Sequence, residues 1–222
     1  MRQYFHQELK KIKKQILTLG AMIEKNVKDA KQAVVTFDSE LADEVIKADL
    51  LIDEKEVEME EDCLKILALH QPVANDLRFL VAVIKINNEL ERIGDQLTNV
   101  ARRIMTISKQ KRCDFVFDYT VMLEKAEHML KLSLDALVNM DFDLAVKVLT
   151  LDDEVDEIRS EAYYMIRDAV IQNPEHADYL LNLMFISRHI ERMADHSTNI
   201  AEDVIYMIEG EIIRHGAIDL NK

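Results

Sequence analysis

The sequence predicts an all-α protein, built as two tandem three-helix bundles that are related by an internal repeat. Three observations support this prediction: apolar residues recur every three or four positions, turn-forming residues are scarce, and one pattern of residue types occurs twice. The chain has 222 residues, of which only 4 are Gly and 2 are Pro. Such a composition favours a few long helices over many short strands. We expect the first bundle within residues 1–110 and the second within residues 111–222.

The repeat is clearest where residues 86–101 are compared with residues 186–201, because seven residue types recur there at an offset of 100. Upstream, ten residue types between 33 and 58 recur between 136 and 161 at an offset of 103. The offset changes between these blocks, which predicts a loop there. A period near 100 residues exceeds the roughly 20–50 residues of solenoid repeats, so it indicates a duplicated domain.

Polar residues and prolines mark the breaks between the predicted helices. Asp38, followed by Ser39, and Asp141 fit the start of the second helix of each copy, since short polar side chains accept hydrogen bonds from free N–H groups there. Pro72 and Pro174 fit the first turn of the third helix of each copy. The six predicted helices are 4–36, 39–69 and 73–109 in the first copy, and 115–139, 142–172 and 176–213 in the second.

The apolar spacing is strongest in the third and fifth predicted helices. Spacings of three and four alternate along both, which is the pattern of helices that pack nearly parallel in a bundle. A strand would need a period of two, and no sustained run of that kind occurs. The predicted core residues are Leu90, Ile93, Leu97, Val100, Ile104 and Ile107 in the third helix, and Leu144, Val148, Leu151, Val155, Ile158, Ala162, Met165 and Ala169 in the fifth.

The charge of the chain argues against nucleic acid as a partner. The net charge is −14, and an acidic surface repels both phosphate backbones and anionic lipid. The one basic run, which comprises Lys10, Lys11, Lys13 and Lys14, is interpreted as a solvated helix face.

The chain also lacks the features of secreted, membrane-spanning or catalytic proteins. No secretion signal and no apolar run of about 18 residues is present, so we expect a cytoplasmic protein. Cys63 and Cys113 form no Cys-x-x-Cys motif, which leaves no basis for a disulfide scaffold or a thiolate metal site. There is no Glu-x-x-His motif, no Gly-rich phosphate loop, no Gly-x-Ser-x-Gly motif and no evident Cys–His pair. We therefore expect no enzymatic activity.

Four pairs of acidic residues lie four positions apart, so the carboxylates of each pair project from one side of a helix. One such pair is usually solvated surface, but here the pairs recur at matched positions in both copies. If neighbouring helices bring two pairs together, each copy holds four carboxylates, which suit hard cations such as Mg²⁺, Mn²⁺, Ca²⁺ or iron. A metal site and a preserved acidic surface both remain open at this point. The pairs are Asp49 with Asp53, Glu91 with Asp95, Asp152 with Asp156, and Glu191 with Asp195.

The position of the acidic pairs predicts their surroundings. If Leu90 and Ile93 face the core, Glu91, Asp95 and Thr98 lie on the opposite, solvent-facing side. Other polar residues near the pairs have simpler roles. We expect Arg92 and Arg192 to pair with acids of a neighbouring helix. Asn99 and Asn199 either hydrogen-bond between helices, which we favour, or supply an amide oxygen to a cation. We expect His128, His189 and His196 to be surface or bundle polar residues.

At these motifs the sequence resembles the PhoU family, the accessory regulators of the bacterial phosphate-specific transport system. The resemblance covers nearly the whole chain, and the order, spacing and duplication of the motifs make it specific. The stretches that support it are Gln71-Pro72-Val73-Ala74-Asn75-Asp76-Leu77-Arg78, Glu91-Arg92-Ile93-Gly94-Asp95, Glu191-Arg192-Met193-Ala194-Asp195-His196 and Asn199-Ile200-Ala201-Glu202-Asp203-Val204-Ile205-Tyr206.

The resemblance implies a negative regulator of the phosphate-starvation response. Its partners would be the ATPase subunit of the phosphate ABC transporter and a sensor histidine kinase, at the inner face of the membrane. Family members have Glu/Asp-x-x-x-Asp motifs that bind metal clusters, and in this sequence these are the four pairs named above. The ions would be divalent or trivalent, with iron, manganese, magnesium and zinc all open. The alternatives are a helical metal-buffering or storage protein and a structural adaptor without metal.

The aromatic residues of the second copy suggest that the protein is a homodimer or a larger assembly. Long helices leave broad lateral surfaces, and aromatic side chains are common anchors in protein interfaces. The candidate anchors are Phe115, Phe117, Tyr119, Tyr163 and Tyr164.

Overall fold

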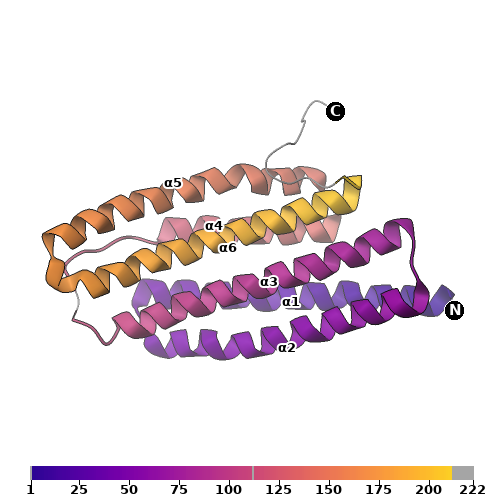
Figure 1. The fold of residues 1–222 in the computed structure, drawn as a ribbon, viewed down its shortest axis with the longest axis horizontal. Helices are drawn as coiled ribbons and strands as arrows, with labels where there is room; N and C mark the ends of the chain where they lie inside the picture. The colour runs from indigo at the N-terminus through magenta and orange to yellow at the C-terminus, as the bar shows by residue number, and fades with distance from the viewer. Residues whose placement is uncertain (1, 112, 212–222) are drawn as a thin grey trace.

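The computed structural model describes residues 2–111 and 113–211, and within these ranges it is entirely helical apart from its connections (Figure 1). The predicted all-α class and the two sets of three helices are confirmed. The elements are α1 (Arg2–Thr36), α2 (Ser39–His70), α3 (Ala74–Ile107), α4 (Thr120–Asn139), α5 (Phe142–Gln172), the short 3-10 helix η1 (Pro174–His176) and α6 (Ala177–Glu209).

The largest difference from the predicted helix boundaries is at the start of the fourth helix. It was predicted from residue 115, but α4 begins at Thr120, whose backbone N–H donates to Asp118 Oδ1 over 2.9 Å. The preceding connection instead places Phe115 and Phe117 against the core. The last helix ends at Glu209, so its predicted continuation through residues 210 and 211 is wrong. Residues 212 and 213, the predicted end of that helix, lie outside the described residues.

Both predicted aspartate caps are confirmed. The side chain of Asp38 accepts hydrogen bonds from the backbone of Glu40 (2.8 Å) and Leu41 (3.1 Å) at the start of α2. Asp141 accepts one from Leu144 (3.0 Å) at the start of α5.

The two prolines lie slightly differently from the prediction. Pro174 begins η1, which leads into α6. Pro72 lies in the connection before α3, because Gln71 is left-handed and Val73 is extended, so no helix continues through them.

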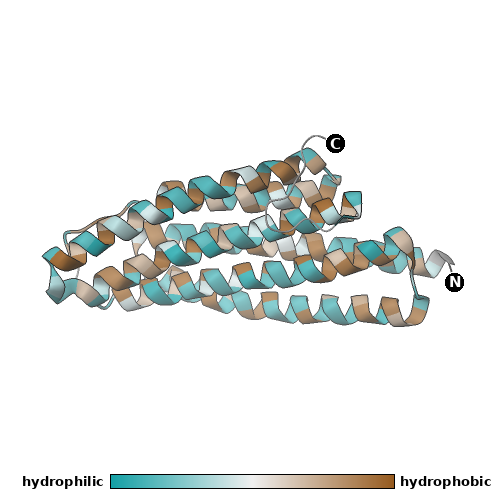
Figure 2. Cartoon of the chain, turned by 45° about the horizontal axis from the view of Figure 1, so that its top comes forward, coloured by the Kyte–Doolittle hydropathy of each residue, from teal (hydrophilic) through white to brown (hydrophobic). Residues whose placement is uncertain are grey.

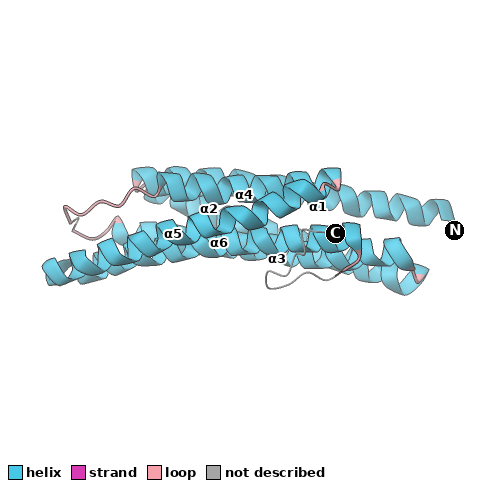
Figure 3. Ribbon diagram, turned by 90° about the horizontal axis from the view of Figure 1, so that it is seen from above, coloured by secondary structure: helices cyan, strands magenta, loops and turns pink. Residues whose placement is uncertain are grey.

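The two bundles join along α3 and α6, which run antiparallel and side by side at the centre of the molecule (Figure 1). The helices α1 and α4 form a second, smaller contact behind this pair (Figures 1 and 3). The remaining helices, α2 and α5, pack on the outer sides of α3 and α6. Each central helix is therefore covered by its own bundle and by the other bundle.

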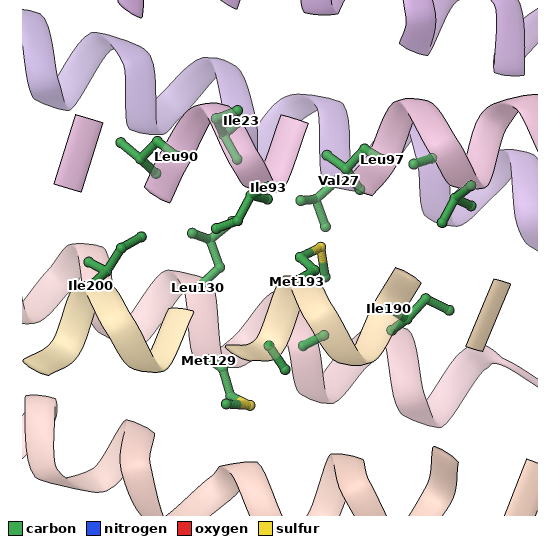
Figure 4. Packing of buried hydrophobic residues seen from close by; sticks show 14 of the residues in the cluster. Ile23, Val27, Leu90, Ile93, Leu97, Met129, Leu130, Ile190, Met193 and Ile200 are labelled. Atoms are coloured by element: carbon green, nitrogen blue, oxygen red, sulfur yellow. The ribbon is translucent and has the colours of Figure 1, made fainter. Parts of the chain in front are cut away.

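A single core extends through both bundles. Each helix alternates apolar and polar stripes along its length (Figure 2), as amphipathic packing requires. Figure 4 shows Ile93 of α3, Leu130 of α4 and Met193 of α6 among the side chains at the junction of the two bundles, and all three are fully buried.

The core residues predicted for α3 are all buried, but one residue predicted for α5 is wrong. Met165 is 42 % exposed, and its neighbour Ile166 is buried in its place. The buried side of α5 passes from Ala162 to Ile166 and Ala169, a spacing of four and then three, which puts Met165 outside the apolar stripe.

Candidate functional site

The first cluster of acidic residues lies between α2 and α3, and we call it the first quartet. The α2 pair, Asp49 and Asp53, faces the α3 pair, Glu91 and Asp95, closely enough for the four side chains to interact electrostatically. The structure thus brings together the two pairs that were predicted to meet in the first copy.

Asp49 is the most deeply placed member of the first quartet, with 8 % of its surface exposed. Its Oδ2 accepts a hydrogen bond of 2.8 Å from the Thr98 hydroxyl, whereas its Oδ1 is buried without a partner among the described residues. Oδ1 lies against Gly94 of α3, where an added Cβ atom would be only 2.5 Å away. The absence of a side chain at Gly94 therefore lets the Asp49 carboxylate reach this position.

The first quartet is strained electrostatically at neutral pH. Burial raises the pKa of Glu91 to about 7, and the neighbouring Asp95 and Asp53 contribute to the increase. Burial also raises the pKa of Asp49, although the Thr98 hydrogen bond opposes this, and it raises the pKa of Asp53 together with the charge of Asp95. Such shifts mean that negative charge here is costly without a compensating cation.

The second quartet lies at the matching place between α5 and α6. Asp152 and Asp156 come from α5, and Glu191 and Asp195 come from α6. Burial raises the pKa of Asp152 to about 6, with Asp195 and Asp156 as further causes. The pKa values of Glu191 and Asp195 are also raised, first by burial and then by neighbouring acids.

The surroundings of the two quartets differ at two pairs of matched positions. Glu56 of α2 adds a carboxylate next to Glu91, and its own pKa is raised by burial and by Glu60 and Asp53. At the matching position of α5, Arg159 instead forms an ion pair of 3.9 Å with Glu191. The second difference is at Gly94, which is replaced by Ala194 in the second copy. The first quartet is therefore the more negative of the two, and its Asp49 is buried whereas the matching Asp152 is half-buried.

The heptad phase predicted open, solvent-facing sites. In the second quartet Asp156 and Asp195 are exposed and Asp152 and Glu191 are half-buried, whereas the first quartet is open only in part. Thr98 and Asp49 are buried, Glu91 is half-buried, and only Asp53 and Asp95 are exposed. The prediction was wrong here because α3 contacts α1, α2 and α6, so it buries more of its circumference than a two-helix seam would.

The first quartet has features that suit a hard cation: clustered carboxylates, a buried oxygen atom without a hydrogen-bond partner, and raised pKa values. As the side chains stand, no three carboxylate, imidazole or thiolate groups in the described ranges lie close enough together to hold one ion. Binding would therefore require the side chains to turn inward, and the metal site stays a prediction.

The residues around the quartets show where sequence reasoning succeeded and where it failed. The Asn199 side chain donates to Glu89 Oε2 of α3 over 3.0 Å, as predicted for a contact between helices. The prediction for Arg92 was wrong, since it pairs with Glu89 of its own helix at 3.5 Å. Glu89 and Glu56 were not identified, although the Glu56–Arg159 difference between the copies was visible in the sequence.

His189 and His196 lie between the bundles. His196 Nδ1 donates to Glu89 Oε2 (2.8 Å), and His189 Nδ1 donates to Gln96 Oε1 (2.9 Å). Burial would raise the pKa of Glu89, but the hydrogen bonds from His196 and Asn199 outweigh it and hold that pKa below its ordinary value. Both histidines therefore make polar contacts between the two bundles, which confirms that they are polar residues of the bundle rather than of the surface.

The aromatic residues proposed as interface anchors differ in exposure, and two of them, Phe115 and Phe117, pack partly buried against the core. Tyr119 is buried, and its hydroxyl donates to the backbone of Leu183 over 2.6 Å, so it cannot anchor a partner. Tyr163 and Tyr164 of α5 are exposed and remain candidates.

Within the described residues, no helix combines the length and the apolar character that crossing a bilayer requires.

Comparison with known proteins connects this architecture to one family. The family model of the PhoU domain matches residues 16–104 and again residues 120–204, one match in each bundle. The chain is 34 % identical to the phosphate-specific transport system accessory protein PhoU homolog of Pseudomonas aeruginosa, over 96 % of this chain and 88 % of that protein. It is 32 % identical to the accessory protein PhoU of Escherichia coli, over 98 % of this chain and 91 % of that protein.

Two solved structures have the same fold. The crystal structure of PhoU from Pseudomonas aeruginosa superposes with a TM-score of 0.90 at 34 % identity, covering 93 % of this chain and all of the other. The phosphate transport system regulatory protein PhoU from Streptococcus pneumoniae superposes with a TM-score of 0.84 at 25 % identity, covering 95 % of this chain and all of the other.

Proposed function

Because the chain belongs to the PhoU family, we propose that it is an accessory protein of phosphate-specific transport that represses the phosphate-starvation response when phosphate is plentiful. It acts in the cytoplasm, where it couples the ATPase subunit of the phosphate ABC transporter to a sensor histidine kinase at the inner face of the membrane. The observation that supports this most strongly is the relationship to named accessory proteins over nearly the full length of both chains.

The quartets add a metal-dependent part to the proposal. A divalent or trivalent cation in each quartet would neutralise carboxylates such as Glu91 and Asp152, whose pKa values are raised first by burial and then by the neighbouring acids. Asp49, Asp53, Glu91 and Asp95 would hold it in the first bundle. Asp152, Asp156, Glu191 and Asp195 would do so in the second. The relatives are named as accessory or regulatory proteins, which supports a role without enzymatic turnover.

Deletion of the gene tests the regulatory role. We expect the deletion strain to express phosphate-scavenging enzymes in phosphate-rich medium, measured as alkaline phosphatase activity, and the intact gene to restore repression. Unchanged alkaline phosphatase activity in the deletion strain would contradict the proposal.

Charge-neutral substitutions test the metal sites. We expect Asp95→Asn to abolish the tighter metal-binding event in calorimetric titration and Asp195→Asn to abolish the weaker one, because Glu56 adds to the first quartet and Arg159 offsets the second. Glu44→Gln, an exposed change on α2, is the control. Equal binding by all four proteins would leave the quartets as acidic surface.

Metal buffering is the second candidate function, and it is favoured by the presence of two acidic quartets rather than one. The complementation experiment separates the two functions. If the Asp95→Asn and Asp195→Asn variants lose metal yet restore repression, the metal serves a separate buffering role.

A further inference from the structure

A groove at one end of the molecule is not accounted for by the proposed function. It lies between the N-terminal half of α1, the start of α3, and the C-terminal ends of α4 and α6, and has a volume of about 650 Å³. Its floor is apolar and includes Leu9, Ile16, Phe79 and Met207. The start of α3 belongs to the 71–78 stretch on which part of the family resemblance rests, and it contributes Asn75, Asp76 and Arg78.

The rim of the groove is basic, although the chain as a whole is acidic. Lys10, Lys13, Arg78 and His6 line it, against a single acid, Asp76, whereas the whole chain has a net charge of −14. Among residues 2–111 and 113–211, no carboxylate lies within ion-pair distance of Lys10, Lys13 or Arg78. Lys10 and Lys13 are therefore more than a solvated helix face: they place unpaired charge beside a hydrophobic surface.

Two of these basic side chains are already oriented by their neighbours. The Lys13 ammonium lies 5.2 Å from the centre of the Phe79 ring, which places it at the edge of the apolar floor. The Arg78 guanidinium lies against Gly210, at the C-terminal end of α6. An anionic group entering the groove would thus meet positioned positive charge.

Apolar side chains on the edge of the groove are exposed. Leu17 of α1 and Val138 and Met140 at the end of α4 are 43 %, 54 % and 47 % exposed, respectively. Contiguous apolar surface of this kind with a polar rim is typical of an interaction site.

The helical wall that α1 gives the groove has no counterpart in the part of the second copy that the structure describes. α1 has 35 residues and α4 has 20, and under the offset of 103 the first residue of α4, Thr120, corresponds to Leu17. The part of α1 that forms the groove wall before Leu17 therefore has no helical equivalent, so the feature is not a by-product of the duplication.

We propose that this groove binds an acidic amphipathic helix of a partner protein, with apolar side chains on the Phe79 floor and carboxylates at Lys10, Lys13 and Arg78. Charge complementarity selects this occupant over a basic segment, and the open, apolar edge at Leu17 and Val138 suits a helix laid into a groove. This inference concerns a surface that shares no residue with the quartets, and it does not depend on them.

Designed peptides test the proposal with the full-length protein. The probe is a fluorescein-labelled helical peptide of about four turns, with Leu along one face and Glu along its flanks. One matched peptide has Lys in place of Glu, and another has the acidic composition in an order that scatters the Leu residues. We expect fluorescence anisotropy to show saturable binding of the acidic amphipathic peptide only.

Substitutions in the groove then locate the binding. We expect the Lys10→Glu/Lys13→Glu double variant to bind the probe roughly tenfold more weakly or worse at low salt, and Val138→Asp to weaken it to a similar degree. Lys28→Glu on α1 and Val121→Asp on α4, at exposed positions outside the groove, should bind as the parent does, with unchanged helical circular dichroism in all variants.

Several results would overturn the proposal. Equal binding of the acidic and basic peptides, or of the scattered peptide, would show that no amphipathic acid is selected. Absence of peptide binding together with binding to phosphatidylglycerol vesicles that the double variant loses would make the groove a lipid site. Self-association abolished by Val138→Asp would make the occupant a second copy of the chain.

Discussion

Glu91 is a carboxylic acid that changes its charge near neutral pH, because burial and its acidic neighbours raise its pKa from 4.5 to about 7. The folded, metal-free protein therefore holds a proton on Glu91 that the unfolded chain releases at lower pH. This difference stabilises the folded state below the unfolded pKa and is lost as the pH rises through about 7. A bound cation would reverse the preference by favouring the carboxylate.

The first prediction is that Glu91→Gln flattens the pH dependence of stability. In urea unfolding of the metal-free protein between about pH 5 and 7.5, the parent should lose stability as the pH rises, and the variant should lose less. Glu44→Gln should behave as the parent. If the Glu91→Gln curve parallels the parent curve, Glu91 does not titrate in this range.

A second residue-scale prediction concerns Gly94. Ala is usually favoured over Gly inside a helix by roughly 0.5–1 kcal/mol, but here the added Cβ would displace the buried Asp49 carboxylate and its hydrogen bond from Thr98. We expect Gly94→Ala to destabilise the parent by about 1 kcal/mol or more and to stabilise an Asp49→Ala background. Chemical denaturation of the parent, the two single variants and the double variant measures the effect of Gly94→Ala on the free energy of unfolding in each background. An equal effect in both backgrounds would refute the prediction.

At the scale of the helices, each of α1, α2 and α4 is followed by a residue with a left-handed backbone conformation. Phe37, Gln71 and Met140 have φ angles of 54°, 45° and 52°, a conformation that glycine adopts more easily than any of them. Phe37 and Met140 precede the capping residues Asp38 and Asp141, so the repeat extends to the geometry of this turn.

The prediction at this scale is that Gln71→Gly stabilises the protein by roughly 0.5–1 kcal/mol, because the left-handed residue after α2 no longer has a Cβ atom. Thermal and urea unfolding measure the change. Ala68→Gly, three residues earlier and inside the exposed last turn of α2, should destabilise by a similar amount. A loss of stability with Gln71→Gly would show that its side chain contributes more than its backbone strain costs.

The sequence predicted the helices well and the depth of the site poorly, for identifiable reasons. Periodicity reports which side of a helix is apolar, so the buried positions from Leu90 to Ile107 followed directly. The carboxylates of the quartets were paired correctly because the duplication repeated them at matched positions. Burial of Asp49 depends on how closely α2 approaches Gly94, and no local pattern encodes the distance between two helices.

At the scale of the whole molecule, the α3–α6 contact resembles the interface of a dimer formed within one chain. His196 contacts Glu89, and His189 contacts Gln96; since positions 89 and 96 match 189 and 196 in the repeat, the two contacts exchange partners as a pseudo-twofold axis requires. At a third pair of matched positions, 85 with 203 and 185 with 103, the two contacts are of different kinds. Lys85 forms an ion pair with Asp203, whereas Arg103 stacks over Phe185 at 4.5 Å.

We predict that residues 1–110 and 111–222, expressed as separate chains, assemble into a one-to-one complex, because each half alone would expose the core face of α3 or α6. Co-purification and light scattering measure the assembly. Met193→Asp, a charge at a position with 1 % exposure, should abolish it by costing more than about 3 kcal/mol. Tyr163→Asp, at an exposed position of α5, should not. Stable, non-associating halves would contradict the prediction.

Placing both halves on one chain also has an evolutionary consequence. In a dimer of identical subunits, every mutation at the interface appears on both sides of the axis, so a new side chain must be tolerated twice. Here a mutation changes one side only, and Glu89 could diverge from His189, or Lys85 from Phe185, while the other side kept its existing contact. After gene duplication and fusion, the two sides of this interface no longer have to be identical. Each half of the molecule can therefore acquire features that the other half lacks, such as the N-terminal residues by which α1 is longer than α4.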